Sequence, residues 1–506
     1  MMVEHWPKSI IGHFILTLLI FFAIDLLSIV SYFNPLSQII IFVLLMMAFI
    51  ALAFMDFSWA IILFFIELII GSQGYLFFLN INQTPISIRL AWFIIIISVF
   101  LIRVIKNHDW LKFKTYLFYA WLLVILAFFW GAVNGYLRND FGNWFLDLNG
   151  YLYLAIFLPL FIASNSHSIW NKLKLVIYPA LSYLAIKTLI LVYLYTHFSV
   201  LSLSPIYSWI RNTGFGEITY AGGNFFRIFS QSHIFILAAA VAWLLFLIIK
   251  WQQMNFDFKK FVSHYNWLVL FGLLQLSVLF ASLSRSFWLA GLVTLAIGFL
   301  AFTFINKLNL KKILFCATGL LVVIIASVGL LFAITKFPIP LPLKATAGDI
   351  LLARVTSGAG EAAGASRLQL LRPLVQEVRK YWLLGSGFGS TITYQSLDPR
   401  LTSSTAGGTG WYTTYAYEWG YLDTWLKIGL MGLLIYLFFW WLLFKNAFYY
   451  IVRNNQTLVP WLVLGGALAV FLTNITTPYL NHPLGIGLLL ILGFYLQFCL
   501  NEKSCE

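Results

Sequence analysis

Three ionisable side chains with a regular spacing stand at the start of an apolar run in the C-terminal part of the chain. The segment EWGYLDTWLKIGLMG, residues 418–432, contains Glu418, Asp423 and Lys427. If a helix begins here, Glu418 lies in its first turn, where the helix dipole favours a carboxylate. Asp423 and Lys427 are four residues apart and lie about 140° and 180° around the axis from Glu418. This spacing predicts an Asp423–Lys427 pair, and it leaves Glu418 for proton transfer or for a purely structural role at the helix end.

Two glycines share the face of Glu418 in such a helix. Gly429 and Gly432 fall within about 40° of Glu418 when each residue turns the helix by about 100°. Small residues on a transmembrane helix let a neighbouring helix approach closely. The pattern therefore predicts a continuous helix over 416–444, with Glu418 above a close contact between helices.

Several arginines stand at the ends of apolar runs. Arg227 precedes one run in FFRIFSQSH, and Arg285 occupies the very short connection between two runs in ASLSRSFW. A guanidinium group held at a membrane surface suits bidentate binding of phosphate oxygens. The alternative is that each arginine reaches into the lipid headgroups without forming a site. Arg138 and Arg211 lie in other connections on the same predicted side.

The whole chain has the composition of a membrane protein. Of its 506 residues, 61% are hydrophobic and only 9% are charged. The net charge of +14 does not indicate nucleic acid as a partner, because the basic residues punctuate the apolar runs and do not gather in one basic region. The three cysteines, Cys316, Cys499 and Cys505, predict neither a disulfide framework nor a metal site. We expect one all-α transmembrane domain over residues 1–506.

Apolar runs of span length recur along the chain. A bilayer core requires about 20 apolar residues per helical span, which gives about fourteen candidates here. The third and thirteenth are short, so twelve or thirteen spans also fit the pattern. The candidates are 10–31, 37–55, 57–71, 86–104, 116–134, 145–165, 174–196, 230–250, 265–282, 286–306, 312–336, 416–444, 457–474 and 481–499.

Lysines and arginines fall in alternate connections, in step with the span count. Cytoplasmic connections are enriched in these residues, which predicts that both termini lie in the cytoplasm. The long connections 199–229 and 338–415 then lie outside, and the second is an external loop inserted before the span that carries Glu418. The basic residues behind this assignment are Arg103, Lys106, Lys112, Lys114, Lys172, Lys174, Lys250, Lys259, Lys260, Lys307, Lys311, Lys312, Lys445 and Arg453.

The external loop contains an amphipathic stretch, SRLQLLRPLVQEVRKYW. Pro373 either starts the predicted helix or kinks it. The apolar residues at helical spacing are Leu368, Leu371, Val375, Val378 and Trp382.

Three ionisable residues, Asp25, Glu67 and Lys187, lie inside apolar runs. An ionised side chain at membrane depth costs about 3 kcal/mol unless it is paired or hydrated. Pairing between helices is therefore the favoured explanation for these three.

Four segments together resemble the O-antigen ligase and O-antigen polymerase superfamily of bacterial integral-membrane glycosyltransferases. In the ligases one motif reads His-Asn, nine residues, Gly-x-x-Gly; here Glu418 and Trp419 precede nine residues and then Gly429 and Gly432. The spacing matches, whereas a glutamate stands in place of the histidine. The four segments, which fall within about residues 220–445, are FFRIFSQSHIF, SLSRSFWLAG, SRLQLLRPLVQEVRKYWLLGSGFGS and EWGYLDTWLKIGLMG.

The resemblance implies a fold of the lipid-dependent glycosyltransferase type in the bacterial inner membrane, with the active site on the external face. The implied donor is a glycan linked to undecaprenyl pyrophosphate, the acceptor is a hydroxyl of a glycan or lipid-linked glycan, and no metal or other cofactor is required. By this resemblance Arg227 and Arg285 would hold the pyrophosphate, Arg367 would also contact the donor, and Glu418 would act as general base. Transfer would invert the anomeric carbon. Because the histidine is replaced, polymerisation of repeat units fits at least as well as ligation.

Other bases and other functions stay open at the level of sequence. His233 and His482 are the next candidate bases, and Arg211 is a further candidate site residue. A flippase for lipid-linked oligosaccharide or a solute transporter is the main alternative, since charges inside spans can line a path. The long external loop and the lack of an internal repeat argue against it. A scaffold in a polysaccharide-assembly complex is the third hypothesis.

Overall fold

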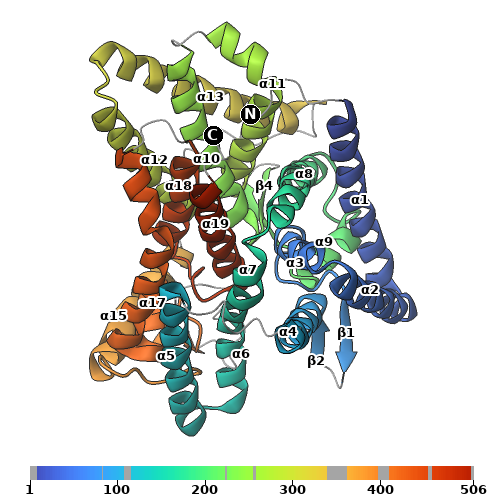
Figure 1. Cartoon of the computed structure of the whole chain (residues 1–506). Coiled ribbons are helices and arrows are strands. Elements are labelled where there is room, and N and C mark those ends of the chain that lie inside the picture. The colour runs from blue at the N-terminus through green and yellow to red at the C-terminus, as the bar shows by residue number, and fades with distance from the viewer. Residues whose placement is uncertain are drawn as a thin grey trace.

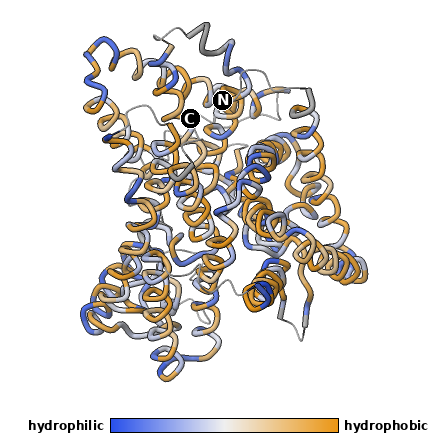
Figure 2. Tube along the Cα trace, viewed as in Figure 1, coloured by the Kyte–Doolittle hydropathy of each residue, from blue (hydrophilic) through white to orange (hydrophobic). Residues whose placement is uncertain are grey.

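Helices account for most of the regular structure. The computed structural model of the chain describes residues 8–81, 84–107, 115–222, 225–254, 258–338, 362–396, 410–453 and 458–502. Within these ranges, 12 helical segments are long and apolar enough to cross a membrane, which confirms the expected all-α, polytopic membrane fold (Figure 1). Hydrophobic residues run along most of each membrane-length helix, and hydrophilic stretches are found at turns and helix ends (Figure 2).

The helices follow the predicted spans closely. One span consists of three consecutive pieces, α6 (Phe141–Leu152), the 3-10 helix η2 (Tyr153–Ile156) and α7 (Phe157–Ala163). The other long helices are α1 (Lys8–Phe33), α2 (Pro35–Met55), α4 (Ile88–Asn107), α5 (Tyr116–Arg138), α8 (His167–His197), α10 (His233–Gln253), α11 (Phe258–Ala281), α12 (Arg285–Ile305), α13 (Leu310–Lys336), α17 (Gly420–Arg453) and α19 (Pro483–Glu502).

Two shorter apolar helices correspond to the third and thirteenth candidate runs. α3 (Phe57–Gly71) has 15 residues and α18 (Leu458–Thr473) has 16. At about 1.5 Å per residue, both are shorter than the hydrocarbon core of about 30 Å. Most of their side chains are buried against other helices. A helix enclosed by protein need not match the thickness of the lipid, because its neighbours are side chains.

The connections that carry the predicted cytoplasmic charges meet at one end of the bundle. Lys172, near the start of α8, pairs with Asp56 between α2 and α3, with 2.5 Å between Nζ and Oδ2. Asp56 also caps α3 by accepting a hydrogen bond from the backbone N–H of Trp59. Arg103, near the end of α4, donates to the carbonyl oxygen of Ala53 at 3.0 Å. These contacts place three connections of the same predicted side together; Lys112 and Lys114 lie outside the described residues.

The connections of the other predicted side meet at the opposite end. The hydroxyl of Ser230, before α10, bonds to that of Ser72, after α3, at 3.1 Å. The hydroxyl of Thr477, after α18, donates to that of Ser286 at the start of α12 at 3.1 Å. The alternation inferred from charge therefore agrees with the contacts within the chain.

Among the described residues, three antiparallel hairpins, each of two strands, lie in connections at this second end. α9 (Ser204–Asn212) precedes the second hairpin and α15 (Ala362–Lys380) precedes the third. Residues 339–361 and 397–409 of the predicted external loop lie outside the described ranges. The hairpins are β1 (Phe78–Ile81) with β2 (Thr84–Ser87), β3 (Glu217–Gly222) with β4 (Phe225–Phe229), and β5 (Ile392–Gln395) with β6 (Trp411–Thr414).

Pro373 lies inside α15, which excludes one of its two predicted positions, the start of the helix. The predicted apolar face is wrong, because Leu368 and Trp382 are exposed. Hydrophobicity alone could not separate the packed side of this helix from apolar residues left at the surface. The buried positions recur every four residues and are Ser366, Leu370, Leu374 and Val378.

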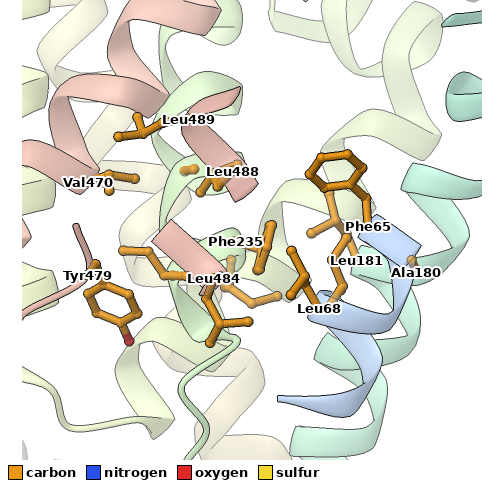
Figure 3. Close-up of a cluster of buried hydrophobic side chains, with 14 of the residues drawn as sticks. Phe65, Leu68, Ala180, Leu181, Phe235, Val470, Tyr479, Leu484, Leu488 and Leu489 are labelled. Carbon is orange, nitrogen blue, oxygen red and sulfur yellow. The ribbon is translucent and has the colours of Figure 1, made fainter. Parts of the chain in front are cut away.

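The helices form two groups that share one core. α1 to α4 and α8 lie on one side of the view in Figure 1, and α5, α12, α17 and α18 lie on the other. Phe235 of α10 lies between Leu68 of α3 and Leu484 of α19 (Figure 3), and all three side chains are buried. α10 and α19 therefore join the two groups through apolar contacts.

The charges inside the first group are paired, as predicted. Lys187 of α8 lies 2.8 Å from Asp25 of α1, measured from Nζ to Oδ1. Arg89 of α4 donates from Nε and Nη2 to the carboxylate of Glu67 in α3, at 2.6 and 3.1 Å. Each pair joins two helices, so these charges have a structural explanation.

The cysteines depart from expectation at one position. Cys316 is free and buried, whereas Cys499 is disulfide-bonded. Cys505 lies outside the described residues. A disulfide depends on the separation and direction of two Cβ atoms, which spacing along the sequence does not give.

Candidate functional site

Glu418 and Arg367 form a bidentate ion pair at the end of the bundle that carries the hairpins. Arg367 donates from Nε to Oε2 of Glu418 and from Nη2 to Oε1, the second at 3.3 Å. The arginine side chain is 38% exposed and the glutamate 48%. Both residues were predicted to belong to the site as separate substrate contacts, and the structure brings them into direct contact.

The neighbours of the pair hold its backbone in place. Trp419 donates from Nε1 to the carbonyl oxygen of Arg367 at 3.0 Å. The buried hydroxyl of Ser366 bonds to the hydroxyls of Tyr394 and Ser396, at 3.1 and 2.8 Å. α15 is also held by a small apolar cluster, whose buried members are Leu370, Leu374, Val378, Ile392, Tyr394, Tyr417 and Leu426.

α17 is broken at Gly429. This residue has φ 73° and ψ 175°, a conformation that residues with a Cβ rarely adopt. The break leaves peptide groups without helical partners, and the segment after α15 supplies them. The hydrogen bonds run from Ser386 N to Leu426 O at 2.7 Å, from Gly387 N to Lys427 O at 3.1 Å, and from Leu430 N to Trp382 O at 2.9 Å.

The glycine turn GSGFGS, residues 385–390, fits closely against three helices. Gly385, Gly387 and Gly389 have positive φ, and a Cβ on any of them would lie within 2.5 Å of a backbone nitrogen of α17, α5 or α6. Asn134 of α5 donates to the carbonyl oxygen of Gly385 at 3.0 Å. The predicted external loop is thus part of the packed structure at this point.

The prediction of a continuous helix beneath Glu418 is wrong. Glu418 lies before the start of α17 at Gly420, and not in its first turn. Gly429 admits a carbonyl group instead of a neighbouring helix, since its Cβ would lie 2.1 Å from the oxygen of Leu383. A constant turn of about 100° per residue does not hold across a residue with positive φ, so the predicted shared face of Glu418, Gly429 and Gly432 does not form.

The predicted Asp423–Lys427 pair is present, and it has a third member, Asp147 of α6. Lys427 Nζ lies 2.6 Å from Asp423 Oδ1 and 2.5 Å from Asp147 Oδ1. The three side chains are at most 5% exposed. Asn481 donates to Asp423 Oδ2, and the backbone N–H of Gly389 donates to Asp147 Oδ2, both at 2.8 Å. This buried triad joins α6, α17, the glycine turn and the α18–α19 connection.

Arg227 and Arg285 lie at one junction. Arg227 in β4 donates from Nε to the carbonyl oxygen of Ser282 at 2.7 Å, and its guanidinium lies 4.7 Å from the centre of the Phe229 ring. Ser282 belongs to the short connection between α11 and α12, and Arg285 is the first residue of α12. Both arginines are partly buried.

The α18–α19 connection links this junction to the Glu418–Arg367 pair. Thr477 bonds to Ser286, the neighbour of Arg285. Asn474 packs against Gly420, where a Cβ would lie 2.5 Å from the Asn474 carbonyl oxygen. The structure therefore places the four main candidate residues at one end of the bundle, in two groups that the α18–α19 connection links.

The two candidate histidines are already engaged. Ser230 donates from its backbone N–H to Nδ1 of the fully buried His233 at 3.3 Å, and Nε2 lies 3.0 Å from the Thr188 hydroxyl. The Nδ1 atom of His482 accepts from the backbone N–H of Leu484 at 3.3 Å. Burial lowers the pKa of His482, and Arg89 lowers it further, so this ring is neutral. A neutral histidine that accepts at Nδ1 carries its proton on Nε2, which is unsuited to a general base.

Arg211 is exposed at the end of α9. Within the ranges that the structure describes, no group of three or more His, Cys, Asp or Glu residues could hold a metal ion.

No family model, curated protein or solved structure matches the chain. A functional proposal therefore rests on the resemblance of the four segments together with the geometry of the site.

Two polar residues in apolar runs, Asp147 and Arg89, were missed by the sequence-based prediction. The rule that singled out Asp25 and Glu67 applies to them as well, because each stands in a span. Their partners Lys427 and Glu67 lie 280 and 22 positions away along the chain. Such separations leave no local pattern that would identify the pairing.

Proposed function

We propose that this protein is a glycosyltransferase of the bacterial inner membrane. It transfers or polymerises a glycan from undecaprenyl pyrophosphate onto a hydroxyl acceptor during cell-surface polysaccharide synthesis. The proposal is supported by the resemblance of four segments to the ligase and polymerase superfamily and by the exposed Glu418 carboxylate in contact with Arg367, at the end of the bundle that also holds Arg227 and Arg285. A carboxylate, with guanidinium groups at the same end of the molecule, suits a reaction that removes a proton and releases a diphosphate.

The reaction assigns a role to each of these groups. The acceptor oxygen forms a bond to the anomeric carbon, while the bond from that carbon to the pyrophosphate oxygen breaks. Glu418 takes the proton of the hydroxyl as general base. Undecaprenyl pyrophosphate leaves with the bonding electron pair, and Arg227 and Arg285 stabilise its charge. Attack opposite to the leaving group inverts the anomeric carbon.

The depth of the site suits a lipid-linked donor. The isoprenoid chain of such a donor stays in the bilayer and its phosphates lie at the surface. Arg285 begins the membrane-spanning α12, and Arg227 lies in the hairpin just before α10. By the charge pattern, this end of the bundle faces the outside of the cell, where surface polysaccharides are assembled.

Glu418→Gln tests the base directly, because it removes the charge and keeps the shape. We expect transfer to fall by about 100-fold or more. The assay uses purified protein in lipid nanodiscs with a polyprenyl-pyrophosphate oligosaccharide, and it follows glycan growth and release of the pyrophosphate lipid. Glu377→Gln is the matched control, since Glu377 lies on the same external segment and pairs only loosely with Lys380, at 3.6 Å. Undiminished transfer by the Glu418 variant would remove this residue from the mechanism.

Changing Glu418, Arg227 and Arg285 together separates an enzyme from a scaffold. Product formation should stop if these residues carry out the reaction. Unchanged product in cells that contain the triple variant would favour a scaffold in a polysaccharide-assembly complex.

Transport is the second candidate function, because the break in α17 and the buried charges next to it are features that transporters use. Two observations argue against a transport role for the break and the buried charges. The peptide groups at the break bond to the segment after α15, and Lys427 is enclosed by Asp147 and Asp423. Movement of intact donor across a vesicle membrane, without glycan transfer, would favour a flippase.

A further inference from the structure

We propose that the Arg367–Glu418 ion pair is the resting state of the site, and that the donor pyrophosphate displaces Glu418 from Arg367. The inference rests on the proposed function and adds an order to it. The donor binds first, and its binding releases the carboxylate that then accepts the proton of the acceptor hydroxyl.

Exposure distinguishes this ion pair from the buried ones. The side chains of the Asp25–Lys187 pair are 10% and 5% exposed, and those of Lys427 and Asp423 are 1% and 0% exposed. Arg367 and Glu418 are 38% and 48% exposed. An anion can therefore approach the guanidinium of Arg367 from solvent, which it cannot do at the buried pairs.

The chemistry of the guanidinium group permits the exchange. Its planar fork of N–H donors binds the two oxygens of a carboxylate, and the same fork binds two oxygens of a phosphate. A pyrophosphate carries more negative charge than a carboxylate. Arg227 and Arg285, which are proposed to bind the same pyrophosphate, would add to the attraction. The donor can therefore compete with the Glu418 carboxylate for Arg367.

The resting pair also blocks the proposed base. Both oxygens of Glu418 accept hydrogen bonds from Arg367. An acceptor hydroxyl that is to give its proton to Glu418 must compete with these donors. When the guanidinium of Arg367 binds the pyrophosphate instead, the Glu418 carboxylate is released at the moment when the leaving group is in place.

Only side chains need to move for this exchange. The backbone of Arg367 is held by Trp419 Nε1, and its neighbour Ser366 is held by Tyr394 and Ser396. The position of α15 is thus independent of the ion pair. Loss of the pair on donor binding does not require α15 to separate from α17.

Binding of undecaprenyl pyrophosphate without a glycan tests the exchange, because no transfer can follow. Affinity is measured for the full chain in nanodiscs, for the unchanged protein, Glu418→Gln, Arg367→Gln and the double variant. Glu418→Gln removes the carboxylate that competes for Arg367. It should therefore raise the affinity for the pyrophosphate by about fivefold, which corresponds to the free energy of one exposed ion pair. Arg367→Gln should weaken binding, and the added Glu418→Gln should then give little gain.

A matched control separates exchange from a general effect of charge. Glu377→Gln removes a carboxylate from α15, the helix that carries Arg367. It should leave the affinity for the pyrophosphate within twofold of the unchanged protein. Arg367→Lys keeps the positive charge but removes the planar fork of donors. In this background, Glu418→Gln should raise the affinity for the pyrophosphate by less than it does with Arg367 present. Size-exclusion elution of each variant monitors folding.

The same gain from Glu418→Gln in the presence and absence of Arg367 would overturn the exchange, and so would no gain at all. The outcome of the binding experiment is independent of the outcome of the transfer assay. Failure of glycan transfer would reject the proposed function, whereas the binding cycle reports only on competition for Arg367.

Discussion

Burial separates the charged side chains of this protein into two kinds. Lys427 lies between two carboxylates, and each member of this triad is at most 5% exposed. Glu418 and Arg367 also form an ion pair, but they are roughly ten times more exposed. A charge enclosed by other side chains can stabilise packing but cannot reach a substrate. The exposed pair is therefore the better candidate for chemistry.

Lys427→Met should destabilise the protein strongly. The change leaves Asp147 and Asp423 as buried carboxylates without a counter-charge, which costs about 3–5 kcal/mol. The expected result is a clear fall in melting temperature, measured by tryptophan fluorescence in detergent. Lys380→Met is the control, because Lys380 is 62% exposed in its pair with Glu377 and should contribute less than about 1 kcal/mol. Equal melting temperatures for the two variants would contradict a structural role for the triad.

The sequence predicts part of this network and not the rest. Asp423 and Lys427 are four apart on one helix, so local geometry is enough to predict their pair. Asp147 is 280 residues from Lys427, and only the packing of α6 against α17 brings them together. The resemblance predicts both Glu418 and Arg367 as site residues, but their contact depends on where α15 lies, which no local spacing determines.

The break in α17 is the feature on which the packing of residues 382–390 depends. The hydrogen bonds of Ser386 and Gly387 to this helix exist because Gly429 interrupts it. From sequence, a glycine on a transmembrane helix indicates a close contact as readily as a break. The same glycine therefore misled the prediction of a continuous span, whereas the long apolar runs correctly predicted the helices around it.

Gly429→Ala should loosen the external segment from the helices. At φ 73° and ψ 175° an alanine costs about 1–3 kcal/mol, and its Cβ would lie 2.1 Å from the carbonyl oxygen of Leu383. We expect faster hydrogen exchange over residues 382–390 and reduced glycan transfer, since this segment attaches the C-terminal end of α15, the helix of Arg367, to α17. The matched control is Gly329→Ala in α13, where a Cβ meets no atom within 4 Å. Unchanged hydrogen exchange in the Gly429 variant would show that the glycine turn packs against the helices without the break in α17.

The helices differ greatly in how much of their surface other helices cover. In the most apolar windows of α8 and α10, 72% and 78% of residues are buried, against 17–22% in those of α1, α2, α12 and α13. α8 and α10 therefore form the centre of the molecule, and the other four present most of their surface to lipid. The apolar runs predict both kinds of helix equally, because lipid and protein interior select the same side chains.

The end of the bundle that carries Glu418 should face the outside of the cell. Contacts within the chain put Lys172, Arg103 and Asp56 at one end and the candidate site at the other. Because basic residues favour the cytoplasmic side, a cysteine at the exposed Thr413 in β6 should react with a membrane-impermeant maleimide in intact cells. A cysteine at the exposed Lys311 in α13 should react only after the membrane is opened. Both changes, Thr413→Cys and Lys311→Cys, are made after replacing the three native cysteines. Labelling of Lys311→Cys alone in intact cells would place Glu418 in the cytoplasm, and a donor presented on the outer face would then be out of its reach.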